Sequence, residues 1–309
     1  MQPIEGKLFS PFQKKVRILK HQPGKTFNFE EELVWEHIDA TVNKIRASEG
    51  FHVTSFRQLI EEVANVTISN RNFEMFYRGQ EIDFKNNQAV YYKDRKSKST
   101  IYPSICRPEK NADGSLKYSI KKSQVLRKYD ELSKMIDFIK GKRGPYYNEY
   151  YYSLLQHYEI LPTPFIDITQ SLRVAATFAL RKSKTGFLFV FGLPYPNQSI
   201  SYYSDLGMVL IKLQNIVQTN ALRPRYQEGF LVGKYPIRPT KTNSDDLANR
   251  MVAKFRLDNK SGMFWDQYFQ PMPDEVLYPV DDEVGRGLEF ALKEFRKNTV
   301  AKPATARRG

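Results

Sequence analysis

Several polar side chains that could take part in chemistry lie singly in this chain, each at the edge of a short apolar stretch. Arg78 follows the apolar-aromatic run 73–77, and Asp167 and Thr169 come at the end of a second apolar run. An arginine at the end of a buried strand is costly unless an anion pairs with it. Arg78 therefore predicts either an anionic ligand or a core carboxylate such as Asp167. A lone histidine is usually structural, but His157 comes just before the second run and is a candidate acid-base group.

The sequence contains none of the short motifs that mark common enzyme classes: no Gly-rich phosphate loop, no GxSxG elbow and no HExxH. Its histidines and its single cysteine, Cys106, show no pair at metal-ligand spacing, so we expect no metal site. We interpret Cys106 as a small apolar filler rather than a nucleophile. A single cysteine also excludes a disulfide within one chain and fits a reducing compartment.

The chain has 309 residues and a net charge of +14, from 48 basic and 34 acidic residues. Such a charge attracts polyanions such as nucleic acid, an acidic membrane or nucleotide phosphates, although it also serves general solubility. The longest apolar stretch, near 187–191, is far shorter than the roughly 20 residues of a membrane helix. The N-terminus has no apolar signal core. We therefore expect a cytoplasmic protein that does not enter a membrane.

Hydrophobic periodicity divides the chain into helices and short strands. Helices are expected over 30–47, 55–64, 115–140, 146–160 and 283–297, and strands over 73–77, 165–168, 186–191, 208–213 and 225–232. The stretch 245–257 fits either state. Thr169 or Ser171 is expected to cap one further helix, whose alanines, including Ala175 and Ala179, allow it to lie close against a sheet. The pattern favours one compact α/β domain.

Five segments occur in the order in which the FRG domain family carries them. They are FYRGQ at 76–80, YPSICR at 102–107, LQHYEILPTPFIDIT at 155–169, RPRYQEGF at 223–230 and LYPVDDE at 277–283. The third is the most specific: it is similar to the family pattern QHYGLPTRLLDWT, with Pro164 where arginine is common and Ile168 where tryptophan is common. The chain thus resembles an FRG domain over 55–297, after an N-terminal arm and helical extension at 1–54 and before a disordered basic tail at 298–309.

The same residues are similar in order to those of ADP-ribosyltransferases, which carry a Y-R-G motif, then a polar strand end before a helix, then a Q/E-x-E strand. This resemblance implies an α/β (α+β) fold with an ADP-ribosyltransferase-like mixed sheet core, surrounding helices and an N-terminal helical extension. It also implies NAD as a substrate. Arg78 and Arg107 are suited to its phosphates and the backbone of Gly79 to its nicotinamide amide. The implied nucleotide site consists of Tyr77, Arg78, Gly79, Gln80, Arg107, Tyr158 and Thr169.

The candidates for catalysis are His157, Asp167, Gln227 and Glu228. Because side chains alternate along a strand, only one of Gln227 and Glu228 can enter a cleft, and the family pattern favours Gln227. A cleft without Glu228 would leave acid-base work to Asp167 or His157. Alternatively, it would hold a nucleotide without turning it over.

Three functions therefore remain open from the sequence. The first is NAD-using ADP-ribosyl transfer to nucleic acid or protein. The second is a non-catalytic nucleotide- or nucleic-acid-binding module of the same fold. The third is a hydrolase or nuclease built on His157 and Asp167. If there is a single site, we expect Arg78, His157, Asp167 and Thr169 to converge on one cleft.

Overall fold

The computed structural model describes residues 1, 2, 4, 8–9, 39–86, 97–108, 120–143 and 147–300. They form a mixed α/β fold on an eight-stranded sheet, as the sequence predicted. Most of the predicted N-terminal arm, the first part of the predicted helix 30–47 and the tail from 301 onward lie outside the described residues. No helix in the described part of the chain is both long enough and apolar enough to span a bilayer.

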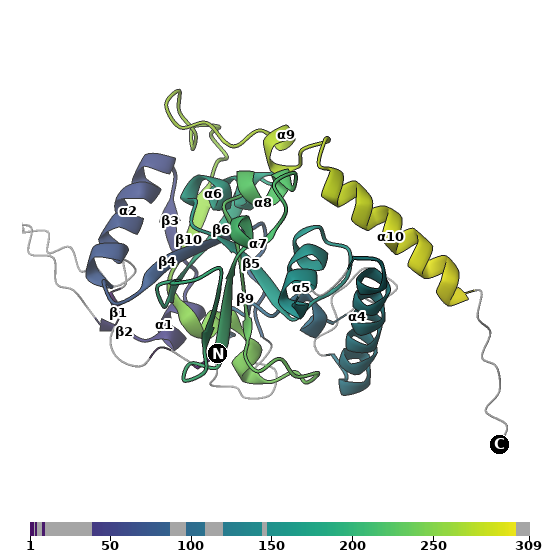
Figure 1. Ribbon diagram of the computed structural model, residues 1–309. Helices are drawn as coiled ribbons and strands as arrows, with labels where there is room; N and C mark the ends of the chain where they lie inside the picture. The colour runs from purple at the N-terminus through teal and green to yellow at the C-terminus, as the bar shows by residue number, and fades with distance from the viewer. Residues whose placement is uncertain are drawn as a thin grey trace, which may run out of the picture.

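The large sheet runs in the order β3-β10-β6-β4-β5-β9-β8-β7, so strands distant in the sequence become neighbours (Figure 1). β3 pairs in parallel with β10, and the other neighbours in this sheet pair antiparallel. Its strands are β3 (Phe51–Val53), β4 (Glu74–Gln80), β5 (Phe165–Thr169), β6 (Thr185–Leu193), β7 (Ile200–Tyr203), β8 (Met208–Lys212), β9 (Gly229–Lys234) and β10 (Met251–Asp258). A separate short ladder joins β1 (Leu8–Phe9) to β2 (Asp39–Ala40).

Helices surround the sheet, with α2 at one end of the molecule and α4, α5 and α10 at the other (Figure 1). The α-helices are α1 (Val42–Ala47), α2 (Phe56–Ser69), α4 (Lys122–Arg143), α5 (Asn148–His157), α6 (Leu172–Leu180), α7 (Leu213–Ile216), α8 (Leu222–Tyr226), α9 (Asp274–Leu277) and α10 (Glu283–Val300). Short 3-10 turns occur at Ser104–Cys106, Asn243–Asp245 and Leu247–Arg250. The ambiguous stretch 245–257 therefore divides into 3-10 turns followed by strand β10.

Several predicted elements differ from the structure at their starts, and the helix predicted from residue 115 begins at Lys122. Within the described part of the predicted helix 30–47, helix begins at Val42, because residues 39–40 form a strand and the Thr41 side chain caps the helix. The strand predicted from residue 225 begins only at Gly229, because α8 occupies the preceding residues. Pro224 does not prevent that helix, since the backbone N–H groups of a first turn have no intrahelical partner.

Helix α6 lies against β4 and β6 at two glycines. A Cβ atom on Gly79 would come within 1.8 Å of the carbonyl oxygen of Ala175, and one on Gly186 within 2.1 Å of the carbonyl oxygen of Ala179. The predicted close packing of this alanine-rich helix is confirmed, and the sheet supplies glycines to match it. Ser171 caps the helix by accepting a hydrogen bond from the backbone of Val174.

The sheet is nearly divided between β4 and β5. β4 pairs with β6 along its whole length, but it pairs with β5 only where Tyr77 faces Thr169. Beyond that point the two strands separate, and the Arg78 side chain bridges them: its Nη1 donates to the carbonyl oxygen of Asp167 at 2.6 Å. The sheet therefore contains an opening at the strand ends that the sequence had marked as chemically interesting.

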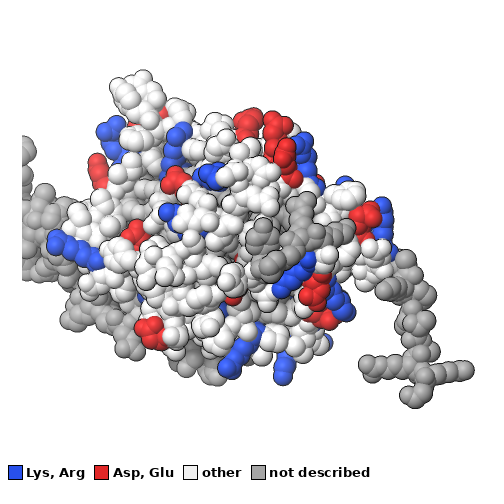
Figure 2. All heavy atoms as spheres, viewed as in Figure 1, with Lys and Arg blue, Asp and Glu red and all other residues white. Residues whose placement is uncertain are grey.

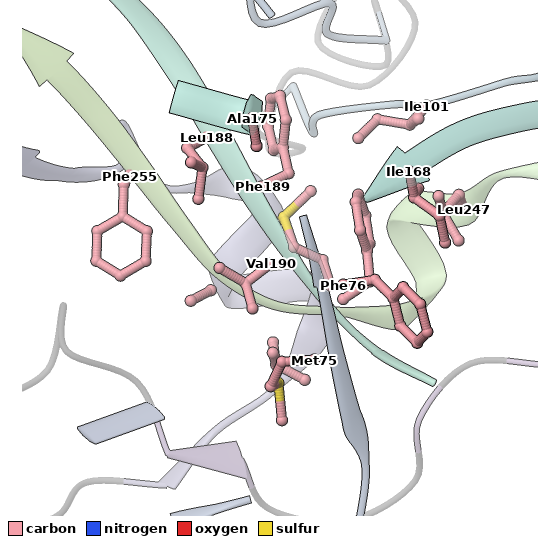
Figure 3. Close-up of a cluster of buried hydrophobic side chains, with 14 of the residues drawn as sticks. Met75, Phe76, Ile101, Ile168, Ala175, Leu188, Phe189, Val190, Leu247 and Phe255 are labelled. Carbon is pink, nitrogen blue, oxygen red and sulfur yellow. The ribbon is translucent and has the colours of Figure 1, made fainter. Parts of the chain in front are cut away.

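Two large apolar clusters hold these layers in place. The first joins the sheet to α6 and includes Phe76, Leu188 and Val190 (Figure 3). The second lies between α4, α5 and α10 and contains Tyr151, which is buried. The predicted tyrosine-rich face of α5 is thus partly core, and α5 is anchored from both sides just before His157.

Candidate functional site

A cavity of about 180 Å³ lies where β4 and β5 separate. β4 contributes residues 77–79, β5 contributes 167–169, and α6 covers the cavity from one side. Arg78, His157, Asp167 and Thr169 all line this cavity, so the predicted convergence of these four residues is confirmed. Its other lining residues are Glu159, Val174, Ala175, Phe178, Arg223, Gln227, Gly229 and Tyr278.

The Asp167 carboxylate is held by two side chains of α5. Gln156 donates to its Oδ2 at 2.6 Å, and Nδ1 of His157 lies 3.3 Å from its Oδ1. The Arg78 guanidinium donates a hydrogen bond to the backbone carbonyl oxygen of Asp167 and not to its carboxylate. A backbone hydrogen bond thus stands in place of the Arg78–Asp167 carboxylate pair that the sequence suggested. The carboxylate keeps 35% of its side-chain surface exposed, and it opens toward the cavity.

The surroundings of Asp167 favour its ionised form. Burial acts to raise the pKa of this carboxyl group, but the hydrogen bond and charge of His157 act against it. The positive charge of Arg78 and the hydrogen bond from Gln156 act in the same direction as His157, and together they lower the pKa of Asp167 below its usual value. The cavity therefore contains a fixed negative charge near neutral pH.

Three buried nitrogen atoms of cavity-lining residues have no hydrogen-bond partner among the described residues. They are Nε of Arg78, Nε of Arg223 and Nε2 of His157. Burial lowers the pKa of Arg78, and the negative charges of Asp167 and Glu159 offset this only in part. Buried polar atoms in proteins are nearly always paired, and the two arginine Nε–H groups are donors. The unpaired atoms therefore indicate a ligand that carries hydrogen-bond acceptors.

Glu159, Arg223 and Tyr278 line the cavity although the sequence did not predict them as site residues. Arg223 pairs with Glu159 at 2.8 Å, and its guanidinium lies 4.6 Å from the centre of the Tyr278 ring. Arg181 lies over the same ring at 4.4 Å and is paired with Asp274. The segment RPRYQEGF contained Arg223, but periodicity could not show which of its two arginines turns inward.

Tyr158, predicted to bind the nucleotide, does not line the cavity. Its hydroxyl donates to both carboxylate oxygens of the buried Asp282, at 2.9 and 2.7 Å. Asp282 also accepts from the backbone N–H groups of Arg223 and Gly285. Burial, followed by this hydrogen bond, raises the pKa of Tyr158. The tyrosine thus connects α5 to α8 and α10, and it helps to position Arg223.

Gln227 lines the cavity and Glu228 is exposed outside it, but strand alternation is not the reason. Both residues precede β9, and Glu228 has a left-handed backbone with φ of 47°. The side-chain amide of Gln227 donates to the carbonyl oxygen of Leu277 at 2.7 Å, and the backbone carbonyl oxygen of Gln227 accepts from Thr169 Oγ1 at 2.8 Å. The end of α8 therefore fixes which of the two enters.

Three other predicted nucleotide ligands have different surroundings. Gly79 is approached by the backbone of α6, which explains why this position lacks a side chain. Gln80 and Arg107 are not among the residues that line the cavity. Arg107 is exposed, and its Nε donates to the carbonyl oxygen of Tyr102 at 2.8 Å.

Comparison with known families adds one match. The family model of the FRG domain matches residues 74–186. This range begins with β4 and ends in β6, so it includes both strands of the opening and the helix that covers it. No curated protein and no solved structure matches the chain.

Proposed function

From the FRG domain that this chain carries over residues 74–186, we propose a nucleotide site at the opening between β4 and β5, with NAD as its ligand. We further propose that the protein is an ADP-ribosyltransferase-like enzyme. The unpaired buried nitrogen atoms of Arg78, Arg223 and His157 carry this proposal. Phosphate and ribose oxygens are acceptors, and two guanidinium groups suit the negative charge of a pyrophosphate.

The size of the cavity limits how much of the ligand it can enclose. Typical small-molecule sites enclose roughly 300–1,000 Å³, whereas this cavity measures about 180 Å³. We therefore propose that it encloses only one end of the dinucleotide. The apolar side chains of Val174 and Phe178 line one part of it, and Arg78 and Asp167 line another. The flat nicotinamide ring beside its polar ribose would match this division.

Asp167 is the residue that we propose for catalysis. In ADP-ribosyl transfer the nicotinamide leaves with the bonding electron pair, and the ribose carbon gains positive charge before the acceptor attacks it. A fixed, ionised carboxylate stabilises such a charge. Asp167 is held by Gln156 and His157 and has a lowered pKa, so it meets this requirement without Glu228.

A second function is favoured by the position of Glu228. This is the carboxylate that an ordinary transferase pattern would use, and it is exposed outside the cavity. The alternative is therefore a module that binds the nucleotide without cleaving it. The same cavity residues would make the contacts in both cases, so binding alone does not separate the two functions.

Two measurements test the proposal. Calorimetry with NAD should show binding that Arg223→Ala weakens about 10- to 100-fold, the range for a lost hydrogen bond to a charged group. Arg225→Ala is the matched control, because Arg225 lies on the same short helix, is exposed and does not line the cavity. Wild-type protein that does not bind NAD, or equal losses in both variants, would refute the site.

Nicotinamide release then separates the two functions. If Asp167 is catalytic, Asp167→Asn should abolish release while NAD binding is retained within a few-fold. A wild-type protein that binds NAD but releases no nicotinamide would establish the binding module instead. Release that persists in Asp167→Asn and disappears in Glu228→Gln would show that our assignment of the carboxylate is wrong.

A further inference from the structure

A second cavity is lined by strands of the same sheet, and nothing in the proposed NAD chemistry uses it. Consecutive residues of two paired strands divide between the cavities: Thr169 and Gly229 line the first, whereas Gln170 and Phe230 line the second. Thr169 and Gly229 face each other in the β5–β9 ladder. Because side chains alternate along a strand, Gly229 and Phe230 of β9 point to opposite faces, so the two cavities lie on opposite faces of the sheet near this position.

The second cavity is wide, at about 580 Å³, and its wall is mostly polar. Phe230 is buried and forms an apolar base, and Lys212 stands directly opposite it in the β8–β9 ladder. Side-chain amides surround this base, together with the Glu74 carboxylate, which accepts a hydrogen bond from Gln170 at 3.0 Å. The remaining amides are those of Asn197, Gln198 and Asn215.

Further side chains in this wall are placed to contact a flat, polar ring and a neighbouring negative charge. Tyr195 is 56% exposed, and its hydroxyl is anchored to the carbonyl oxygen of Arg71 at 3.1 Å, so the ring is held at the cavity edge. Asn197 accepts a hydrogen bond from Ser201 at 3.0 Å, which fixes its amide. The ammonium group of Lys212 has no acidic partner within the described residues.

We propose that this second cavity binds one unpaired base of a single-stranded nucleic acid. Amide side chains present adjacent donors and acceptors, which is how proteins read the edges of exposed bases. An exposed tyrosine offers a face for stacking, and a lysine without an acidic partner suits the neighbouring phosphate. The net charge of +14 favours a polyanionic partner over an uncharged one.

Lys and Arg are interspersed with Asp and Glu on the face seen in Figure 2, without a continuous basic stripe there. The inference rests on the proposed function in one respect only, namely that the bound nucleic acid is the acceptor of the transferase.

Fluorescence anisotropy with a labelled single-stranded oligonucleotide of about 10 nucleotides tests the inference without NAD. Tyr195→Ala should weaken binding about 5- to 150-fold, the range for one base-stacking contact. Tyr195→Phe keeps the ring and should bind nearly as wild type, which separates stacking from a loss of folding. Duplex of the same sequence should bind more weakly, because its bases are already stacked and paired.

A charge-matched pair of variants tests the lysine. Lys212→Ala should weaken oligonucleotide binding several-fold more than Lys293→Ala, which removes the same charge from an exposed position on α10. Equal effects of these two variants, or no effect of Tyr195→Ala, would overturn the inference. Oligonucleotide binding that depends on Tyr195 in a protein that does not bind NAD would refute the proposed function and leave this site standing.

Discussion

Replacing Gly79 with alanine tests what the glycine of the Tyr77-Arg78-Gly79 motif is for. The added Cβ would lie 1.8 Å from the carbonyl oxygen of Ala175 and 2.7 Å from the backbone nitrogen of Ala179. Both atoms belong to the backbone of α6, so no side chain can rotate away to make room. The helix would have to move outward by more than about 1 Å to restore an ordinary contact distance.

The expected cost follows from that displacement. Overpacking a core usually costs about 1–3 kcal/mol and occasionally more. Because the obstacle here is backbone on a helix that is itself buried, we expect Gly79→Ala to lower the free energy of unfolding by about 3 kcal/mol or more. Urea denaturation followed by circular dichroism measures this value. Gly186→Ala should behave similarly, since its Cβ would lie 2.1 Å from the carbonyl oxygen of Ala179.

Gly287→Ala provides the control for this experiment. Gly287 lies within α10, and a Cβ atom added there would meet no neighbouring atom within 4 Å. Alanine should therefore stabilise the helix by up to about 1 kcal/mol. A Gly79→Ala protein with wild-type stability would refute the reasoning. If its stability is normal but NAD binding is lost, the glycine serves the ligand rather than the helix.

Three further outcomes are expected. Because its pKa is lowered in the fold, Asp167 stabilises the protein above the ordinary pKa of an aspartate, and this contribution is lost as the pH falls through the lowered value. Asp167→Asn should therefore flatten the pH dependence of the free energy of unfolding below about pH 4, as urea titrations at each pH would show. Asp83→Ala should lower the free energy of unfolding, measured by chemical denaturation, by about 3–5 kcal/mol, because it leaves the fully buried Lys254 without the carboxylate 3.0 Å away. Replacing Asp83 with leucine and Lys254 with methionine together should leave the free energy of unfolding nearly unchanged. Tyr158→Phe should lower stability by about 1.5–3 kcal/mol in thermal or urea denaturation, since it removes the 2.7 Å hydrogen bond to the buried Asp282 carboxylate, and an unchanged melting curve would contradict that connection.

Part of the site could be predicted because strand ends and helix caps leave local signals. Arg78, Asp167 and Thr169 each follow an apolar run, and the ends of neighbouring strands meet in space. The alanines of α6 likewise predicted close contact with a sheet, since small side chains repeat on one helical face. These features depend on residues near one another in the sequence, and all of them appear in the structure.

Other features depend on pairings that periodicity does not contain. The separation of β4 from β5 is a matter of hydrogen-bond register, and no residue pattern specified it. Arg223 enters the site because Tyr278 and Glu159, distant in sequence, provide a ring and a charge for it. The family pattern favoured Gln227 at the cleft, but strand alternation does not select it, because a short helix replaces the first part of the predicted strand.

The opening beside Arg78 also makes the large sheet mechanically two units. Four strands lie on each side of it, and the ladder between them is a single facing pair, Tyr77 and Thr169. The two units are otherwise joined by α6, by the guanidinium of Arg78 and by side-chain packing such as that of Phe76 against Phe230. A nucleotide bound at this opening would contact both four-stranded units and hold them together. It would therefore slow amide hydrogen exchange in both units, including at amides that do not contact the nucleotide.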